Sequence, residues 1–444
     1  MAATIMNRRN ILKCFALLSF SGVSTKLLAN DPSYEKNDIE VLKKIHHSSV
    51  SPKDFGAVGD GKANDTIAVL KMIDYAVSHS LSIDLRGGPW KISNTIDFTD
   101  IKEISCDWTG RFIVDPVNFD SNCSYVVTLG SPDSSFRSRR ANNLCINGLL
   151  CIVSTSKKKK LNGLFIKGSL LKIDAIRVIG FNGEGVNISA TWDSSFVSIS
   201  TEDCGNTEYY QFSINRYGDT SNCLFIGRLQ CERANHKCFS IECIRSVINT
   251  IHAERTIILI DDEKNKKIPS KLNYVNVKID VGNTTINQIF HDVSKKSKYK
   301  KSSVLLNIDH GSIKDVQMND SVISTSFGRF SEYINISARS WFFSGNQITN
   351  NVISNPKILQ DITVINDTKI QYGKINNLSL GAGCSGSYFL NVNIAGINTI
   401  PDTVESCYFQ ACVFECEYDA IINRDSLKKN IESKKIIFND CRYI

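Results

Sequence analysis

A short motif that recurs after 22 residues constrains the fold of this chain more than any other feature of its sequence. Residues 229–234 read LQCERA and residues 251–256 read IHAERT, so a Glu–Arg pair returns at the same place in each copy. Internal repeats of about 20 to 50 residues are typical of solenoids. Without a helical pattern, this period fits one coil of a parallel β-helix, in which residues one coil apart lie about 4.8 Å apart. The repeat therefore predicts that the two Glu–Arg pairs stack on one outer face.

Further acids extend this column if each coil places an acid three residues after an apolar residue. The distances in sequence between such pairs vary, as expected if the strands have a fixed length and the loops between them do not. The pairs are Ile199…Glu202, Leu229…Glu232, Ile251…Glu254, Val277…Asp280 and Leu306…Asp309. Aliphatic and acidic residues are common, so ordinary surface carboxylates explain any single pair equally well. Glu232 and Glu254 are the strongest members because their neighbours also repeat.

The composition agrees with a chain of short strands. The 444 residues are 42% hydrophobic and include 26 glycines but only 8 prolines. Alternating apolar segments such as 144–148, 186–189 and 196–200 end at glycine or polar residues, and no long amphipathic helices separate them. We therefore predict an all-β fold that forms one solenoid, because a solenoid grows by adding coils instead of splitting into domains.

The charge distribution argues against a nucleic-acid partner. The net charge of +7 is mild for this length and comes partly from two basic runs, 157–160 and 295–301, that are expected in loops. Runs of this kind are usually solvated, although they can attract an acidic polymer. No basic patch is interleaved with aromatic residues, so we expect no binding of nucleic acid.

The first 30 residues resemble an export signal. Residues 7–13 read NRRNILK, which is similar to the twin-arginine consensus, and residues 14–29 are moderately apolar but too short to span a bilayer comfortably. We therefore expect a periplasmic or secreted protein with no membrane partner once the signal (1–30) is removed. The alternative is a disordered basic and apolar leader. Residues 31–50 are polar and are expected to form a linker.

Residues 51–66 read SPKDFGAVGDGKANDT. This stretch closely resembles the opening of the pectate-lyase-like superfamily of right-handed β-helices, which includes pectin-degrading hydrolases and tailspike-type polysaccharide depolymerases. The resemblance implies a single-stranded right-handed parallel β-helix with an N-terminal capping helix, and we place this domain at 51–402. The apolar stripe along 66–80 suits the capping helix. The segment 403–444 is richer in cysteine and charge and is expected to pack as a C-terminal cap.

Individual residues of this opening suit the structure that the resemblance implies. Gly59 and Gly61 permit the dihedral angles of tight turns, and Asp65 or Thr66 can cap the start of the helix. Trp90 stands where the family has an aromatic residue in its first coil.

The 15 cysteines are expected to be mostly buried. Their spacing contains no CxxC motif, and several lie inside strand-like segments, such as Cys223, Cys231, Cys238 and Cys243. A free cysteine packs as a small apolar residue. We therefore expect few disulfide bridges, no metal site and no cofactor.

The stacked glutamates are the leading candidates for catalysis. Glycoside hydrolysis requires one protonated and one ionised carboxyl group, about 5–5.5 Å apart in retaining enzymes and about 6.5–9.5 Å apart in inverting ones. Stacked Glu232 and Glu254 would repel each other, which favours a shared proton and supplies both forms in one place. Asp261 and Asp262, expected on a turn after the next strand, are the second choice.

Neighbouring side chains are candidates for substrate binding. The two arginines are expected to face away from the glutamates unless the strand bends; if they turn outward, they oppose proton sharing or bind an acidic sugar. A histidine or an aromatic residue nearby can contact a sugar, but a structural histidine and a buried ring are equally ordinary outcomes. The candidate substrate-binding residues are Arg233, Arg255, His252, Glu202 and Trp192.

These observations favour an exported enzyme that hydrolyses a polysaccharide by carboxylate acid/base catalysis in a groove on the β-helix. The expected partner is therefore a polysaccharide, acidic polymers included, and a homotrimer is left open. Two alternatives remain: a lyase or epimerase acting on uronic-acid polymers, and a non-catalytic glycan-binding surface protein. The sequence blocks of the polygalacturonase branch are largely missing, since only Asp261-Asp262 and the segment 309–314 echo them.

Overall fold

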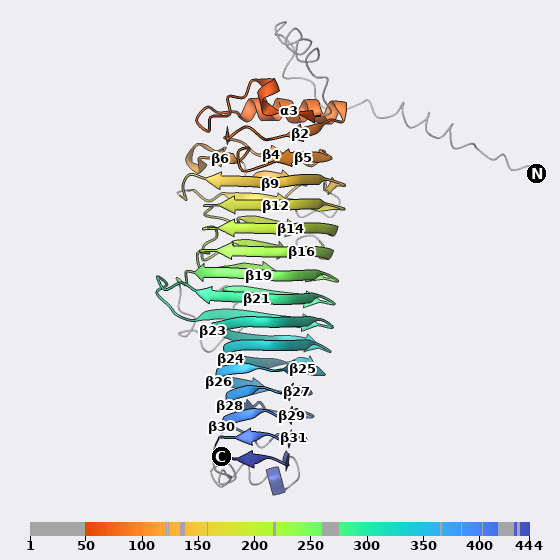
Figure 1. Ribbon diagram of the computed structural model, residues 1–444, viewed down its shortest axis with the longest axis vertical. Coiled ribbons are helices and arrows are strands. Elements are labelled where there is room, and N and C mark those ends of the chain that lie inside the picture. The colour runs from red at the N-terminus through yellow and green to blue at the C-terminus, as the bar shows by residue number, and fades with distance from the viewer. Residues whose placement is uncertain are drawn as a thin grey trace, which may run out of the picture. The chain divides into compact units, whose positions relative to one another are not determined.

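The computed structural model describes residues 49–444 except 121, 123, 134–137, 158, 216–218, 260–274, 365, 383, 402, 416–429 and 433–435. Figure 1 shows that these residues form a stack of β-strand coils with helix α3 at one end. The signal predicted at 1–30, almost all of the linker predicted at 31–50 and the Asp261–Asp262 pair lie outside the described residues. Within the described residues, no helix has the length and apolar character needed to cross a membrane.

The stack begins at the stretch that resembles the superfamily opening. Strand β1 (Ser49–Val50) and the 3-10 helix η1 (Pro52–Phe55) lead to α3 (Thr66–His79), which confirms a helix at the predicted place. The helix packs against η1, β1, β2 and β3 through a face that buries Ala68, Val69, Met72, Ile73 and Ala76. The capping role of this helix stays a prediction.

The loop before α3 is built around Trp90. Its side chain is fully buried, and its indole N–H donates a hydrogen bond to the carbonyl oxygen of Leu85 at 2.7 Å. Gly59 has a φ of +72°, and a Cβ atom there would lie 2.8 Å from the Trp90 ring, so glycine is required. Asp65 precedes the helix, but its carboxylate accepts hydrogen bonds from the amides of Val58 and Gly59 at 2.7 and 3.2 Å. It therefore holds the loop and does not cap the first helical amides.

Strands from successive coils form a first continuous row. Each strand pairs in parallel with its counterpart in the next coil. The row consists of β1, β2 (Ser82–Asp84), β5 (Glu103–Cys106), β9 (Cys145–Ser154), β12 (Lys172–Ile179), β14 (Trp192–Glu202), β16 (Ser221–Glu232), β19 (Val247–Thr256), β21 (Thr285–Val293), β23 (Ser312–Arg329), β24 (Glu332–Thr349), β26 (Lys357–Val364), β28 (Lys374–Leu380), β30 (Asn393–Thr399), β32 (Val413–Phe414) and β34 (Arg442–Tyr443).

A second row closes the other side of the coils, and its strands also pair in parallel. It consists of β4 (Ile96–Asp97), β7 (Tyr125–Leu129), β10 (Asn162–Ile166), β13 (Val186–Ser189), β15 (Phe212–Asn215), β17 (Phe239–Ile241), β20 (Val277–Gly282), β22 (Ser302–Asp309) and part of β23. The remaining elements are β3 (Trp90–Ile92), β6 (Phe112–Val114), η2 (Pro116–Asn118), β8 (Ala141–Asn142), β11 (Gly168–Ser169), β18 (Cys243–Ile244), β25 (Asn351–Ser354), β27 (Thr368–Gln371), β29 (Tyr388–Leu390), β31 (Cys407–Gln410) and β33 (Ile436–Asn439). This pairing confirms the predicted parallel β-helix.

Apolar side chains stack in columns inside the coils. In the first row, one column runs through Ile176, Ile199, Leu229, Ile251 and Ile289, which are paired in register and at most 1% exposed. Because side chains alternate between the two faces of a strand, the buried column fixes which residues point outward. The core of each coil therefore sets the outer surface that the coil presents.

Most of the cysteines contribute to this interior. Of the twelve that the structure describes, all have free thiols and nine are buried, which confirms the predicted burial. Cys231, for example, lies in register between Thr201 and Ala253. Cys223 is an exception: it is exposed because it sits at a bend in β16 with a φ of +53°. The prediction that Cys223 packs in the core is therefore wrong.

The strand ladder continues through the segment predicted as a C-terminal cap. Strand β31 pairs with β29 and β33, and β32 pairs with β30 and β34, all in parallel. The rings of Phe389, Phe409 and Phe438 stack on one another across these coils, with centroids 4.5 and 4.9 Å apart. Coils are therefore present on both sides of residue 403.

Replacing Leu229 by alanine tests the role of the apolar column. The side chain is fully buried between Ile199 and Ile251, so we expect the Leu229→Ala variant to lose about 2–5 kcal/mol of unfolding free energy. Val197 lies on β14 but is 56% exposed, and the control Val197→Ala should lose less than about 1 kcal/mol. Urea denaturation followed by circular dichroism measures both; equal losses would contradict the assignment of the column to the core.

Candidate functional site

Three glutamates lie side by side where three strands of the first row end. Glu202, Glu232 and Glu254 stand on β14, β16 and β19, and the strand register pairs Glu202 with Glu232 and Glu232 with Glu254. The predicted stacking of the repeated glutamates is therefore confirmed, and Glu202 extends it. The exposed fraction of the side chains rises along the column, from 15% at Glu202 to 18% at Glu232 and 34% at Glu254.

The two acids proposed to lengthen the column do not belong to it. Asp280 lies on β20 and Asp309 on β22, which are strands of the second row. The predicted column places Val277 after Ile251, but Val277 pairs with Phe239 and Val304. The apolar-x-x-acid pattern occurs on both rows, so spacing alone assigned these acids to the wrong side of the coils.

The arginines that follow the glutamates turn outward because the backbone bends there. Arg233 and Arg255 have φ angles of +52° and +56°, and the corresponding residues of the two preceding coils, Gly180 and Asp203, have +83° and +54°. At this corner the amide of Arg233 donates to the carbonyl oxygen of Glu254 at 2.9 Å, which keeps adjacent coils paired. The left-handed residue breaks the alternation of the strand, so glutamate and arginine reach the same surface.

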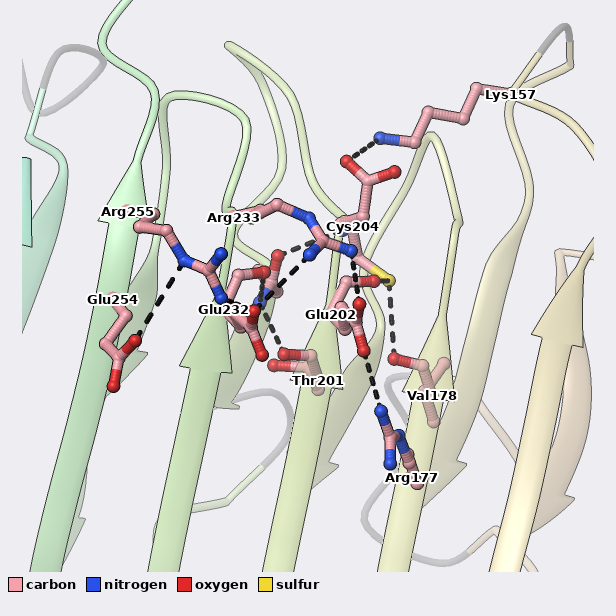
Figure 2. Close-up of polar contacts among 12 residues, drawn as sticks. Lys157, Arg177, Val178, Thr201, Glu202, Cys204, Glu232, Arg233, Glu254 and Arg255 are labelled. Carbon is pink, nitrogen blue, oxygen red and sulfur yellow. Dashed lines mark hydrogen bonds and ion pairs between the residues drawn. The ribbon is translucent and has the colours of Figure 1, made fainter. Parts of the chain in front are cut away.

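Acids and arginines alternate along this surface, as Figure 2 shows. Arg177 contacts Glu202 at 2.8 Å, and Arg233 contacts both Glu202 and Glu232, the second at 3.3 Å. Arg255 contacts Glu232 and lies 4.0 Å from Glu254. We call this set the ion-pair ladder: Arg177, Glu202, Arg233, Glu232, Arg255 and Glu254.

In the ion-pair ladder, arginine side chains and not a shared proton neutralise the stacked acids. Partial burial raises the pKa of Glu202, but the hydrogen bond from Arg177 and the charge of Arg233 outweigh burial, so this pKa lies below its usual value of 4.5. The repulsion between Glu232 and Glu254 is relieved by the guanidinium of Arg255, which reaches toward both carboxylates. This matches the alternative in which outward arginines oppose the sharing of a proton.

Glu254 has a different environment from the other two acids. Its carboxylate lies 2.8 Å from Nε2 of His252, and the His252 ring meets the edge of the Phe290 ring with centroids 5.0 Å apart. His252 and Phe290 are neighbours in register on β19 and β21. The more exposed end of the ladder therefore combines a carboxylate, an imidazole and an aromatic ring.

One predicted site residue that the structure describes, Trp192, does not join this group. Trp192 lies at the opposite end of β14 from Glu202, where Arg140 stacks on its ring at 3.6 Å. Glu202 is ten positions after Trp192 on β14, which corresponds to roughly 30 Å along an extended chain. Asp261 and Asp262 fall outside the described residues.

Sequence reasoning missed Arg177 and Phe290. Arg177 lies on β12, and the residue of β12 in register with Glu202 is Ile179. Because that position is not acidic, the pattern of repeated acids does not extend to this coil. Phe290 lies on β21, and only the pairing of His252 with Phe290 places its ring beside His252, which contacts Glu254. Within the described residues, no group of three or more His, Cys, Asp or Glu side chains is arranged to hold a metal ion.

Comparison with known proteins finds similarity in sequence to a phage protein. No protein-family model matches the chain. A capsule KN4-specific depolymerase of Klebsiella phage KN4-1 is 31% identical over 101 residues, which make up 22% of this chain and 11% of the phage protein. The chain thus spans about a tenth of the length of this relative.

Comparison with solved structures gives matches of low sequence identity. PfbA, a surface adhesin of Streptococcus pneumoniae, matches with a TM-score of 0.48 and 10% identity over 83% of this chain and 92% of the adhesin. An exopolygalacturonase from Thermotoga maritima matches with a TM-score of 0.37 and 9% identity over 86% of this chain and 96% of that enzyme. The parallel β-helix assigned here rests on the strand pairing of the chain itself.

Replacing Glu202 by glutamine tests the ion-pair ladder through its pH dependence. The pKa of Glu202 is depressed in the folded protein, so its stabilising contribution is present above pH 4.5 and is lost as the pH falls through the folded value. We expect Glu202→Gln to cost about 1 kcal/mol near pH 7, with the gap to the wild type closing below pH 4.5.

Urea denaturation at a series of pH values measures this gap, and Glu332→Gln, at an exposed acid that begins β24, is the matched control. The control should follow the wild type throughout. If the unfolding free energy of Glu202→Gln stays below that of the wild type by the same amount down to pH 3, the loss comes from the shape of the side chain and not from its charge.

Proposed function

We propose that the protein is a polysaccharide depolymerase that hydrolyses glycosidic bonds at the ion-pair ladder, with Glu232 and Glu254 as its catalytic carboxylates. The observation that carries this proposal is the pairing of these two partly exposed acids on adjacent coils, on one face of the β-helix. Adjacent strands lie about 4.8 Å apart, which is nearer to the carboxylate separation of about 5–5.5 Å in retaining enzymes than to the wider inverting separation.

The surroundings of the two acids support different roles. Glu232 contacts two guanidinium groups, which suits the group that must carry a negative charge and attack the anomeric carbon. Arg255 lies 4.0 Å from Glu254 but much closer to Glu232, so the anionic form of Glu254 has less cationic support than that of Glu232, which suits the proton donor. In the first step, Glu254 gives its proton to the glycosidic oxygen as Glu232 bonds to the anomeric carbon. In the second step, Glu254 takes a proton from water, and the hydroxide releases Glu232.

Neighbouring side chains provide contacts for a sugar polymer. The side chains of Arg233 and Arg255 are 40% and 50% exposed, and each guanidinium carries five N–H donors, more than its ion pairs use. They therefore suit hydroxyl groups or the carboxylates of an acidic glycan. Phe290 and His252 place an apolar ring surface beside Glu254, where one face of a pyranose can pack.

The match to a capsule-specific phage depolymerase supports the same class of substrate. The similarity covers 101 residues at 31% identity, so it bears on part of this chain and a small part of the phage protein. We take from it the substrate class, a bacterial capsule or related surface polysaccharide, and not the identity of the sugar.

Reducing-end release from a panel of bacterial capsular and plant polysaccharides tests the proposal. We expect Glu232→Gln and Glu254→Gln each to reduce the rate by about 10²–10⁴-fold, because each removes a group that acts on the scissile bond. Glu332→Gln, remote from the ladder, should keep the wild-type rate. Melting curves of all three variants verify that the fold is retained.

The products separate the competing functions. New reducing ends without ultraviolet absorbance indicate hydrolysis, an unsaturated absorbing product indicates a lyase, and a polymer of unchanged length with altered uronic-acid configuration indicates an epimerase. Binding without any product indicates a glycan-binding protein. Wild-type rates in Glu232→Gln and Glu254→Gln would remove both residues from the mechanism.

A further inference from the structure

Four cysteines near the C-terminal end of the stack form two pairs that join adjacent coils. The Sγ atoms of Cys384 and Cys407 lie 3.6 Å apart, and both side chains are fully buried. Cys412 and Cys441 directly precede β32 and β34, where the register pairs Val413 with Arg442. Cys412 and Cys441 therefore stand opposite each other on adjacent strands, close enough for each thiol to shift the pKa of the other.

We propose that these two pairs, Cys384–Cys407 and Cys412–Cys441, are sites of disulfide formation that tie the last coils of the solenoid together. Disulfides need Cα atoms about 4.4–6.8 Å apart, and positions in register on adjacent parallel strands, such as those of Cys412 and Cys441, are spaced about 4.8 Å apart. The amide of Arg442 donates to the carbonyl oxygen of Cys412 at 2.8 Å, so the strands around the second pair are held at this spacing.

The chemistry starts at Cys441, which is partly exposed, whereas Cys412 is buried. The hydrogen bond from Cys412 lowers the pKa of Cys441 to about 7, so much of this thiol is ionised at neutral pH. Its thiolate attacks one sulfur of an external disulfide and releases a thiolate. That thiolate takes the proton of Cys412, whose sulfur then attacks Sγ of Cys441 and releases the second thiol. Two protein thiols are thereby oxidised, and one external disulfide is reduced to two thiols.

The same exchange applies to the first pair once the end of the stack opens. The hydrogen bond from Cys407 lowers the pKa of Cys384, which makes Cys384 the attacking group. Each coil of a solenoid contacts only its neighbours, so a group of coils can open locally while the others stay paired. A bridge between adjacent terminal coils restricts the opened chain and opposes its unwinding.

A third thiol pair in the middle of the stack provides an internal control. Burial raises the pKa of the Cys231 thiol and Cys238 raises it further, so these two thiols also interact, and both are fully buried. Coils stack on both sides of them, since β16 pairs with β14 and β19. Interaction between thiols is therefore common to all three pairs, and position in the stack distinguishes them: this pair follows β16, whereas the two that we expect to oxidise lie between β28 and β34.

Peptide mapping of the full chain tests the proposal. The folded protein is reduced, freed of reductant, incubated with glutathione disulfide at pH 7.5, then unfolded, alkylated and digested for mass spectrometry. We expect linked peptides that join Cys384 to Cys407 and Cys412 to Cys441, with Cys231 and Cys238 recovered in alkylated form. Alkylation of all four terminal cysteines, glutathione retained on Cys441, or bridges to Cys123, Cys231, Cys238 or Cys416 would overturn the assignment.

Variants test the structural consequence. Cys441→Ser should abolish the second bridge and leave the first, while Cys223→Ser, which removes an exposed cysteine far from the end, should leave both. Oxidised wild type should melt at a higher temperature than the reduced protein, and Cys441→Ser should lose part of that rise. Bridges that form without any change in melting temperature would contradict the proposed tie between the coils.

Discussion

The register of hydrogen bonding between successive coils is the constraint on which the rest of this structure depends. Once Leu229 lies between Ile199 and Ile251 in the core, the outward residues three places later must also be neighbours, so Glu232 lies between Glu202 and Glu254. A slip of one residue would exchange the buried and exposed faces of a strand. The same apolar contacts that stabilise the solenoid therefore bring together acids that are 22 and 30 residues apart in the sequence.

Stacking like charges at the spacing of β-strands is unfavourable unless something offsets their repulsion. Here the left-handed bend after each glutamate turns Arg233 and Arg255 into the acid column, and Arg177 neutralises its far end. The depressed pKa of Glu202 follows from these contacts. The arrangement leaves Glu254, beside His252, as the least enclosed acid of the ladder, and it is at this end that the surface has an aromatic neighbour in Phe290.

The sequence predicts this site only where its pattern is tied to the core. Glu232 and Glu254 could be predicted to stack because their apolar neighbours repeat with them, and the opening motif correctly predicts α3 and a parallel β-helix. Asp280 and Asp309 were misplaced because loop lengths decide which row a strand joins, and spacing alone does not reveal them. The arginines turn outward because the backbone has a positive φ at Arg233 and Arg255. Arginine seldom adopts such a φ, so its presence in the sequence does not predict this bend.

We propose that register places a catalytic carboxylate pair on one face of the solenoid, and a crystal structure with bound substrate would reveal whether a sugar binds there. The Glu254→Gln variant, soaked with an oligosaccharide of the polysaccharide that the wild type cleaves, should show a sugar on the ion-pair ladder. Its glycosidic oxygen should lie within hydrogen-bond distance of the side chain at position 254, and its anomeric carbon should face Glu232. A sugar bound only on the second row, or a register in which Glu232 and position 254 are not neighbours, would contradict the account.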